Sequence, residues 1–395
     1  MKAKSQYFNE DHQLFRQSVK QFITKEVIPH TEVWENQRRI PSDIFRRMGE
    51  LGYLGLLYPE KYGGTNADLW FSVVFLEEIA RCGMGGFATA VSVHQYMAVN
   101  HIAKIGSEYL KEKYLVPAIK GQKIAALGIT EPNAGSDVSG LQTTAIRNGD
   151  EYIINGSKTF ISNGVYGDFI TLAVKTKADA NTLDRAQNAV SLLVVDLTSE
   201  GITRTPLNKM GWHSSDTAEI KFDDVRVPVS HLIGMENFGF YYLMESLQLE
   251  RLVAGIMAVA GSQWALEHTL QYLNEREAFG RKIGKFQAIR HKIADVATEI
   301  AVAQEFVYAT CWKFSNGDTA VKECSMAKLF TAELQKRVVD TCLQFFGGYG
   351  YIEDYPICRA YRDVRVGTVA GGTSEIMREI IAKIIVDAVG YKAVY

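Results

Sequence analysis

The order of hydrophobic patterns along the chain constrains its fold more than any single motif does. Phe15, Val19, Phe22 and Ile23 fall at i, i+4, i+7 and i+8, which is the spacing of an amphipathic helix. Helical patterns return at about Gly234 and continue almost to the C-terminus, whereas short β-rich runs bounded by turn residues lie between. This order predicts an α+β protein of three domains, α, β and α, in which the two helical parts pack together.

The middle region carries the clearest local signal. Asn148-Gly149 lies between two apolar runs within residues 146–152, a pattern typical of a β-hairpin. Further strands are expected at Phe169–Val174 and Val190–Leu197, so this region is predicted to form an antiparallel sheet or a small barrel. The expected domains are an N-terminal α-helical bundle at residues 1–121, a β domain at 122–233 and a C-terminal α-helical domain at 234–395.

Composition argues against several classes of protein. The formal net charge of -2 over 395 residues gives no basic field for nucleic acid or anionic membranes. Five scattered cysteines without a C-x-x-C pair argue against a disulfide framework or a zinc site and fit a reducing compartment. The eight histidines show no metal-ligand spacing and the sequence has no Gly-x-Ser-x-Gly motif, so we expect neither a bound metal nor a serine nucleophile.

The sequence also predicts a compartment. Its N-terminus lacks the apolar core of a secretory signal and carries acidic residues, which transit peptides avoid. The longest uncharged stretch, Leu252–Leu266, is too short to span a bilayer. We therefore expect a soluble, cytoplasmic protein without membrane insertion.

Two segments of the expected β region could hold a ligand. Residues 127–137 are rich in small and hydroxyl residues, so their backbone N–H groups can turn toward an anion or a flat polar ring, with Thr130 and Ser136 as further donors. An ordinary connection of turn-forming residues explains this composition equally well. In residues 156–164, Phe160 could stack on an aromatic cofactor while Ser162 bonds its rim, although an edge strand with a turn is the simpler interpretation.

The helix expected at Phe238–Leu273 carries two charged residues in apolar surroundings. Glu250 and Arg251 lie among apolar residues on both faces, and a helix that is apolar all round is buried. Buried charges need a partner or a cavity, because an unpaired buried charge is costly. This segment alone favours a structural ion-pair network, and a ligand site lined by one of the two residues is the alternative.

Two glycine-rich segments lie near the C-terminus. Residues 344–350 end one expected helix, and residues 370–375 open the last one. Glycine lets a backbone approach a ligand closely, and the free N–H groups at a helix start can bind an anion. A helix-ending loop and ordinary N-capping by Thr373 or Ser374 are equally good explanations.

Taken together, these segments resemble the acyl-CoA dehydrogenase family along nearly the whole chain, and its long-chain and isovaleryl types most of all. Residues 129–137 are similar to the family's first signature and residues 344–350 to its second. Residues 158–163 are similar to the flavin-contacting strand, and residues 276–287 to the segment that reaches a neighbouring subunit's FAD. The resemblance implies a small middle β barrel, a C-terminal four-helix bundle, and FAD as a cofactor bound between them.

The resemblance also implies a set of ligand-binding residues by position. FAD would be held by Leu127, Ile129, Thr130, Gly135, Ser136, Phe160, Ile161, Ser162, Arg276, Phe279, Gln287, Gln344, Gly347, Gly348, Thr373 and Glu375. The acyl-CoA would be lined by Ser136, Tyr241, Gln248, Arg251, Gly371 and Gly372.

One departure from the family pattern concerns the catalytic base. Medium-chain members carry the base just before the last Gly-Thr, where this chain has Gly371. Long-chain and isovaleryl members carry it on the preceding long helix, where this chain has Glu250. The resemblance therefore implies that Glu250 is the base, which agrees with its separate identification as a buried carboxylate. A second departure is Gln248, where isovaleryl enzymes tend to carry Asp.

The function that the resemblance implies is FAD-dependent α,β-dehydrogenation of a medium-to-long-chain acyl-CoA to the trans-2-enoyl-CoA, as in fatty acid β-oxidation, with flavin N5 as hydride acceptor. Electrons would pass to electron-transferring flavoprotein. Shared FAD sites imply a homo-oligomer, in this family most often a tetramer. An isovaleryl-type, short branched substrate is the alternative. An oxidase-like enzyme that reduces oxygen and a catalytically silent acyl-CoA-binding protein are more distant alternatives.

Overall fold

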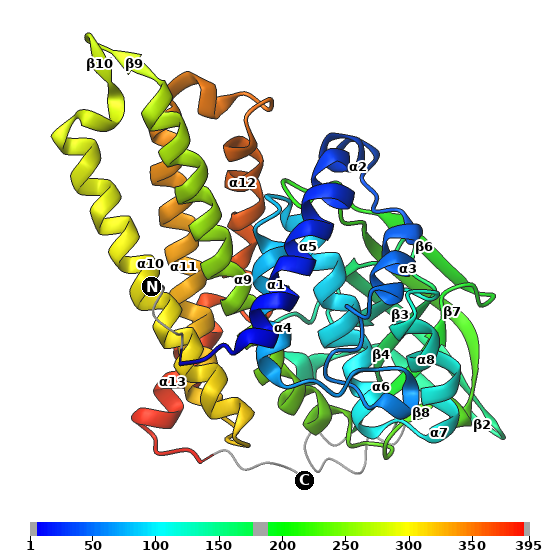
Figure 1. Cartoon of the computed structure of the whole chain (residues 1–395). Coiled ribbons are helices and arrows are strands. Elements are labelled where there is room, and N and C mark those ends of the chain that lie inside the picture. The colour runs from blue at the N-terminus through cyan, green and yellow to red at the C-terminus, as the bar shows by residue number, and fades with distance from the viewer. Residues whose placement is uncertain (1–5, 177–188, 391–395) are drawn as a thin grey trace.

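The computed structural model describes residues 6–176 and 189–390, and in these ranges a β region lies between two helical regions in the sequence (Figure 1). The predicted order of helical, β and helical domains is therefore confirmed. Within the described ranges, no helix combines the length and the apolar character needed to cross a membrane.

The N-terminal region is built from short helices. The predicted amphipathic stripe forms α1, which buries Val19 and Phe22. Helix α4 is mostly apolar and almost entirely buried, so it lies inside the molecule. Pro41 precedes the start of α3, as the sequence indicates. The helices are α1 (Glu10–Phe22), α2 (Thr31–Gln37), α3 (Ser42–Glu50), α4 (Leu69–Ala80), α5 (Gly85–Ser92), α6 (Val99–Ile105), α7 (Glu108–Leu110) and α8 (Val116–Ile119).

The β region forms one sheet in the order β6-β7-β3-β2-β4-β5-β8, with β1 parallel to β4. The predicted hairpin is confirmed, because Asn148 pairs with Glu151 and Gly149 between them has φ +62. The strands are β1 (Ala125–Gly128), β2 (Thr144–Asn148), β3 (Glu151–Ser162), β4 (Phe169–Lys175), β5 (Val190–Asp196), β6 (Ile202–Pro206), β7 (Thr217–Pro228) and β8 (Leu232–Ile233).

The C-terminal region is dominated by three long helices that lie side by side (Figure 1). Its central helix α9 packs against α11 and also against α4 of the N-terminal region, so the two helical regions share one apolar core. The elements are α9 (Gly239–Glu275), the hairpin of β9 (Glu277–Ala278) and β10 (Arg281–Lys282), α10 (Gln287–Ser315), α11 (Val321–Phe346), α12 (Pro356–Val364) and α13 (Ser374–Ile385).

A buried carboxylate joins the three regions. Asp363 of α12 accepts hydrogen bonds from the backbone N–H groups of Trp212, at 2.6 Å, and Gly85, at 3.0 Å. Arg359, one turn earlier, donates to the Gly83 carbonyl at 2.9 Å. Burial raises the pKa of Asp363 to about 7. These bonds fix the loop before β7 and the start of α5 against the C-terminal helices.

Replacing Asp363 with Ala should destabilise the protein, because the N–H groups of Trp212 and Gly85 would lose their acceptor in a buried site. We expect a loss of about 2 kcal/mol in the free energy of unfolding, the cost of unsatisfied buried donors. Thermal unfolding compared with Asp354→Ala, an exposed carboxylate in the preceding loop, measures it. Equal unfolding temperatures for the two variants would contradict this role of Asp363.

Candidate functional site

The carboxyl group of Glu250 lies inside the helical core. The side chain is 6% exposed, and its Oε1 atom has no hydrogen-bond partner among the described residues. Burial raises the pKa of Glu250 from 4.5 to about 7, while the Ser246 hydroxyl and the Arg251 charge act in the opposite direction. A buried carboxyl with an unsatisfied oxygen and a near-neutral pKa can exchange a proton with a bound molecule at physiological pH.

Arg251 contacts polar groups on two helices. Its Nη1 donates to Gln248 Oε1 at 3.2 Å and to Ser325 Oγ of α11 at 3.4 Å. Gln248 in turn donates from Nε2 to the Met244 carbonyl at 3.0 Å. The guanidinium thus bridges α9 and α11, and the hydrogen bonds described for it do not include Glu250. Arg251 still acts on Glu250 electrostatically, because its charge opposes the effect of burial on the Glu250 pKa.

The turn before α13 is fixed by a buried lysine. Lys328 of α11 is 2% exposed and donates from Nζ to the Gly372 carbonyl. Burial lowers the pKa of Lys328 to about 8, and the neighbouring Arg251 lowers it further. Gly371 and Gly372 have φ values of +66 and +93, which favour glycine, and a Cβ added at Gly371 would meet nothing within 4 Å. This turn therefore presents its backbone to open space.

Thr373 and Glu375 lie at the start of α13. The Thr373 hydroxyl accepts from the Ile376 N–H at 3.2 Å and caps the helix, as expected from ordinary N-capping. Ser374 donates to Glu333 at 2.9 Å, and the exposed Glu375 lies 3.5 Å from Arg378. The contacts of Lys328 and Arg251 place this helix start near the α9–α11 interface that carries Glu250.

A second group of predicted site residues lies where the 129–137 loop meets β3. The Thr159 N–H donates to the Thr130 carbonyl at 2.9 Å. Lys158 reaches from β3 to Glu131 at 2.7 Å and to the Ile129 carbonyl at 3.1 Å, and both ends of this ion pair are buried. Burial lowers the pKa of Lys158 to about 8, which the Glu131 charge opposes. These bonds bring Thr130 beside Phe160.

Phe160 has an unusual position for a large apolar residue. Its side chain is 70% exposed and its φ is +60, in the left-handed region that such residues seldom adopt. The register shift between β3 and β7 at Lys158–Ile161 produces this conformation. Strained residues of this kind cluster at functional sites.

The neighbours of Phe160 differ in accessibility. Ile161 is 2% exposed and packs in the sheet core, so only its backbone can reach a ligand, whereas Ser162 is half-buried. In the facing loop, Gly135 and Ser136 are exposed, and Leu127 and Ile129 are half-buried against the core.

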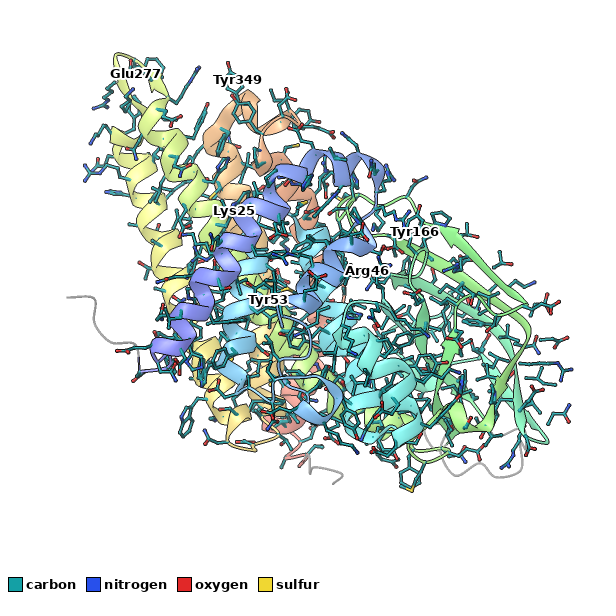
Figure 2. All side chains as sticks on the ribbon, turned by 45° about the vertical axis from the view of Figure 1, so that its right-hand side comes forward. Lys25, Arg46, Tyr53, Tyr166, Glu277 and Tyr349 are labelled. Atoms are coloured by element: carbon teal, nitrogen blue, oxygen red, sulfur yellow. The ribbon has the colours of Figure 1, made fainter. Side chains whose placement is uncertain are left out.

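A third group surrounds a hollow at the opposite end of the long helices. The hollow has a volume of about 500 Å³ and is lined by Arg276, Gln344, Gly347 and Gly348, together with aromatic residues such as Tyr349. The Arg276 guanidinium lies 5.6 Å from the centre of the Tyr349 ring. Figure 2 shows Tyr349 and Glu277 of the hairpin at this end of the molecule, far from Tyr166 of the β region.

The remaining predicted residues have exposed side chains. Phe279 at the tip of the β9–β10 hairpin is 94% exposed, and Gln287 begins α10 with an exposed side chain. Tyr241, 37% exposed, lies near the start of α9, where its ring neighbours the rings of Phe238 and Phe240. Lys328 and Gln344 are separated by sixteen positions of α11, or about 24 Å of helix, so one chain divides its predicted site residues between distant places.

Three residues at the site were not identified from the sequence. Glu131 lies within the first signature segment and forms a buried ion pair with Lys158. Lys328 stands between apolar residues of an amphipathic helix, a signal that could have identified it as a buried charge. Ser246 carries no such signal, because a single serine in an apolar helix is common.

The described residues contain no group of three or more His, Cys, Asp or Glu side chains that could hold a metal ion. All five cysteines are free, and Cys82, Cys311, Cys324 and Cys342 are buried. Burial raises the pKa of Cys82 and Cys324 to about 12, so these thiols remain protonated.

Comparison with known proteins covers almost the whole chain. Family profiles described as the N-terminal, middle and C-terminal domains of acyl-CoA dehydrogenase match residues 9–122, 126–225 and 237–386. The long-chain specific acyl-CoA dehydrogenase, mitochondrial, of Sus scrofa is 38% identical over 96% of this chain and 87% of its own length. The isovaleryl-CoA dehydrogenase, mitochondrial, of Pongo abelii is 35% identical over 95% and 88%.

A solved structure shows the same fold. The crystal structure of acyl-CoA dehydrogenase from Geobacillus kaustophilus superposes with a TM-score of 0.93 and is 41% identical, covering 97% of this chain and 100% of that one.

The three groups of residues fit FAD, the cofactor that the resemblance implies. At Gly135, Gly347, Gly348 and Gly371 an added Cβ would meet nothing within 4 Å, so these backbones border open space that a ligand can fill. The guanidinium of Arg276 in its hollow can bind a phosphate, and the exposed ring of Phe160 can face a flat ring system.

Replacing Lys158 with Met should both destabilise the protein and loosen the 129–137 loop, because it leaves the Glu131 carboxylate buried without its cation. Breaking a buried ion pair from one side costs about 3–5 kcal/mol. Thermal unfolding measures the loss of stability, and the flavin-to-protein absorbance ratio measures cofactor retention. Lys221→Met, which removes an exposed lysine of β7 that pairs with Asp223, is the matched control. A Lys158→Met protein as stable and as yellow as this control would disprove the clamp.

Proposed function

The chain belongs to the acyl-CoA dehydrogenase family, and from this premise we propose that Glu250 is the base in the α,β-dehydrogenation of a medium-to-long-chain acyl-CoA. The protein is an oxidoreductase that acts on a CH–CH bond and uses FAD. The chain length, the identity of the base and the electron acceptor are the proposed parts.

The observation that carries the proposal is the state of the Glu250 carboxyl. Its pKa of about 7 makes it a stronger base than an exposed glutamate, and a substantial fraction of it is still ionised at neutral pH. Its Oε1 atom is buried and has no hydrogen-bond partner in the described part of the chain, so a bound substrate is the natural partner for it. The residue at the alternative base position, Gly371, has no side chain to abstract a proton.

The turn before α13 supports the second requirement of the reaction. The Cα–H bond of a thioester is a weak acid, so its carbonyl oxygen must be stabilised as negative charge develops. Among the described residues, neither the Gly371 N–H nor the Gly372 N–H donates a hydrogen bond to the protein. Lys328 holds the Gly372 carbonyl and thereby fixes the orientation of this turn. These backbone donors are suited to bind the thioester carbonyl.

The proposed reaction divides the two hydrogens between protein and cofactor. Glu250 takes the Cα hydrogen as a proton, and the electron pair left behind forms the Cα–Cβ double bond as the β hydrogen leaves with its own pair. Bound FAD supplies the acceptor for this hydride at flavin N5. Burial of Glu250 and of the surrounding helices excludes water, which keeps the base strong.

Two observations support the proposed substrate, a medium-to-long acyl chain with isovaleryl-CoA as the alternative. The porcine relative is named for long-chain substrates, and the Pongo abelii relative is named for isovaleryl-CoA at slightly lower identity. Gln248 and Tyr241 would contact the acyl-CoA together with Ser136 and Arg251.

Anaerobic titration of the yellow protein with butanoyl-, isovaleryl-, octanoyl- and hexadecanoyl-CoA, followed by flavin absorbance, discriminates between these substrates. Strongest bleaching by isovaleryl-CoA would select the alternative, and no bleaching by any would overturn the dehydrogenase proposal.

We further propose that FAD sites are shared between copies of this chain and that electron-transferring flavoprotein accepts the electrons. Lys328 holds the Gly371–Thr373 turn, and Gln344 lines the hollow together with Arg276. These two residues lie about 24 Å apart along α11 of one chain, and this separation supports a site shared between copies. The hairpin tip with Phe279, 94% exposed, is available to reach a second copy. A shared site requires a homo-oligomer, and the family resemblance favours a tetramer.

Replacing Glu250 with Gln should abolish turnover while FAD remains bound, because the amide keeps the volume of the side chain but cannot accept the proton. We expect a loss of at least about a thousandfold in the rate of flavin bleaching by the best acyl-CoA. Glu245→Gln, five positions earlier on α9, removes a half-buried carboxylate that lies 3.8 Å from Lys104 and should retain activity. Comparable bleaching rates for the two variants would refute Glu250 as base.

The bleaching rate should increase with pH through about 7. Glu250 is active only when ionised, and burial raises its pKa to about 7, so acidification protonates the base and slows the reaction. Stopped-flow measurements of flavin bleaching at subsaturating acyl-CoA between about pH 5.5 and 8.5 report this ionisation of the free enzyme. A rate that is already at its plateau at pH 6 would show that Glu250 ionises like an exposed glutamate.

A further inference from the structure

Ser246 is a buried hydroxyl one helical turn before Glu250, and its partner lies on a different helix. Asn100 of α6 donates from Nδ2 to Ser246 Oγ at 3.0 Å. Ser246 and Asn100 are 2% and 3% exposed, so water does not compete for this bond. Because the Ser246 oxygen acts as an acceptor toward Asn100, its own O–H proton remains available for donation in another direction.

Other buried hydroxyls of the same bundle bond in a different way. Each donates to the carbonyl four residues earlier in its own helix at 2.7–2.8 Å, as Ser262, Thr269, Thr310, Ser325 and Thr331 do. Such back-bonding uses the hydroxyl proton within the helix. The hydrogen bond described for Ser246 is instead the one from Asn100, and Glu250 lies on the same face of α9, four residues further on.

We propose that Asn100 and Ser246 are positioning residues for Glu250: Asn100 holds the Ser246 oxygen, and the Ser246 hydroxyl donates to the Glu250 carboxylate. This inference rests on the proposed function of Glu250 as base. The donation stabilises the ionised carboxylate and so opposes the effect of burial on its pKa, the direction in which Ser246 acts. It also fixes which oxygen of Glu250 is left for the substrate, in agreement with Oε1, for which residues 6–176 and 189–390 provide no hydrogen-bond partner.

Asn100 is neutral, so its replacement leaves the charges around Glu250 unchanged. Arg251 on α9 lowers the pKa of Glu250, and burial lowers the pKa of His101 on α6 to about 4, which keeps that imidazole neutral. Other charged or titratable groups near this part of α9 or on helices packed against it include Glu245 of α9, Lys104 of α6, Glu77 and Glu78 of α4, Tyr308 of α10, Lys328 of α11 and Asp363 of α12. All of them remain in the variants below.

The test is a direct titration of Glu250 by infrared difference spectroscopy of the purified FAD-loaded protein, without acyl-CoA. Glu250 is identified by the carbonyl band of a protonated carboxyl that appears in the wild-type spectrum and is missing from the spectrum of the Glu250→Gln variant. We expect its midpoint to rise by about 0.5–1 pH unit in Ser246→Ala, the size of one net hydrogen bond to the charged form. Asn100→Leu should produce a similar rise, because the freed hydroxyl can then bond back to its own helix.

The controls separate positioning from a general loss of packing. Ser262→Ala removes a buried hydroxyl of the same helix that is bonded to the Ala258 carbonyl, and it should leave the midpoint unchanged even if it lowers the unfolding temperature. Ser246→Thr keeps the hydroxyl and should restore the midpoint. In a Ser246→Ala background, Asn100→Leu should add nothing, because it acts through Ser246.

An unchanged midpoint in Ser246→Ala, or an Asn100→Leu shift that persists without Ser246, would overturn the inference. A parallel kinetic measurement keeps it distinct from the proposed function. If acyl-CoA bleaches the wild-type flavin, the pH dependence of bleaching in Ser246→Ala should shift upward by the same amount as the infrared midpoint. If no acyl-CoA bleaches the wild type, the proposed function fails, while the infrared midpoints still decide the role of Asn100 and Ser246.

Discussion

The packing of α9 between α4 and α11 is the constraint on which the rest of the site depends. It removes Glu250 from water and thereby raises the pKa of Glu250 to about 7. The opposing effects of the Ser246 hydroxyl and the Arg251 charge are smaller than this effect of burial. The same packing brings Arg251 to Ser325 of α11. A carboxylate at the protein surface would have neither the basicity nor the unsatisfied oxygen that the proposed chemistry needs.

The ligand-facing loops are fixed by polar contacts that lie behind them. Lys158 and Glu131 hold the 129–137 loop on β3, Asp363 holds the loop before β7 and the start of α5, and Lys328 holds the turn before α13. Each contact is buried and uses a charged group, which makes it costly to break. The signature segments of this chain therefore combine residues that face the ligand with residues that hold the backbone in place.

Most of the fold could be predicted from the sequence because its elements have strong local patterns. The long apolar run predicted α9 to within a few residues, and Asn148-Gly149 predicted the hairpin of β2 and β3. Short elements escaped: α12 is only nine residues long, and β6 is a mostly exposed strand with little apolar pattern. The burial of Glu250 followed from its apolar neighbours. Its partners did not, because Asn100 lies 146 positions away from Ser246 and only the packing of α6 on α9 brings them together.

The central claim is that Glu250 itself removes the α proton, and exchange of that hydrogen with solvent tests it most directly. The FAD-loaded protein is incubated anaerobically in D₂O with a saturated acyl-CoA that bleaches its flavin, and deuterium at Cα is measured by mass spectrometry. We predict incorporation by the wild-type protein and by Glu245→Gln, and none above the uncatalysed rate by Glu250→Gln although it binds the same acyl-CoA. Deuterium incorporation by Glu250→Gln at the wild-type rate would show that another group is the base.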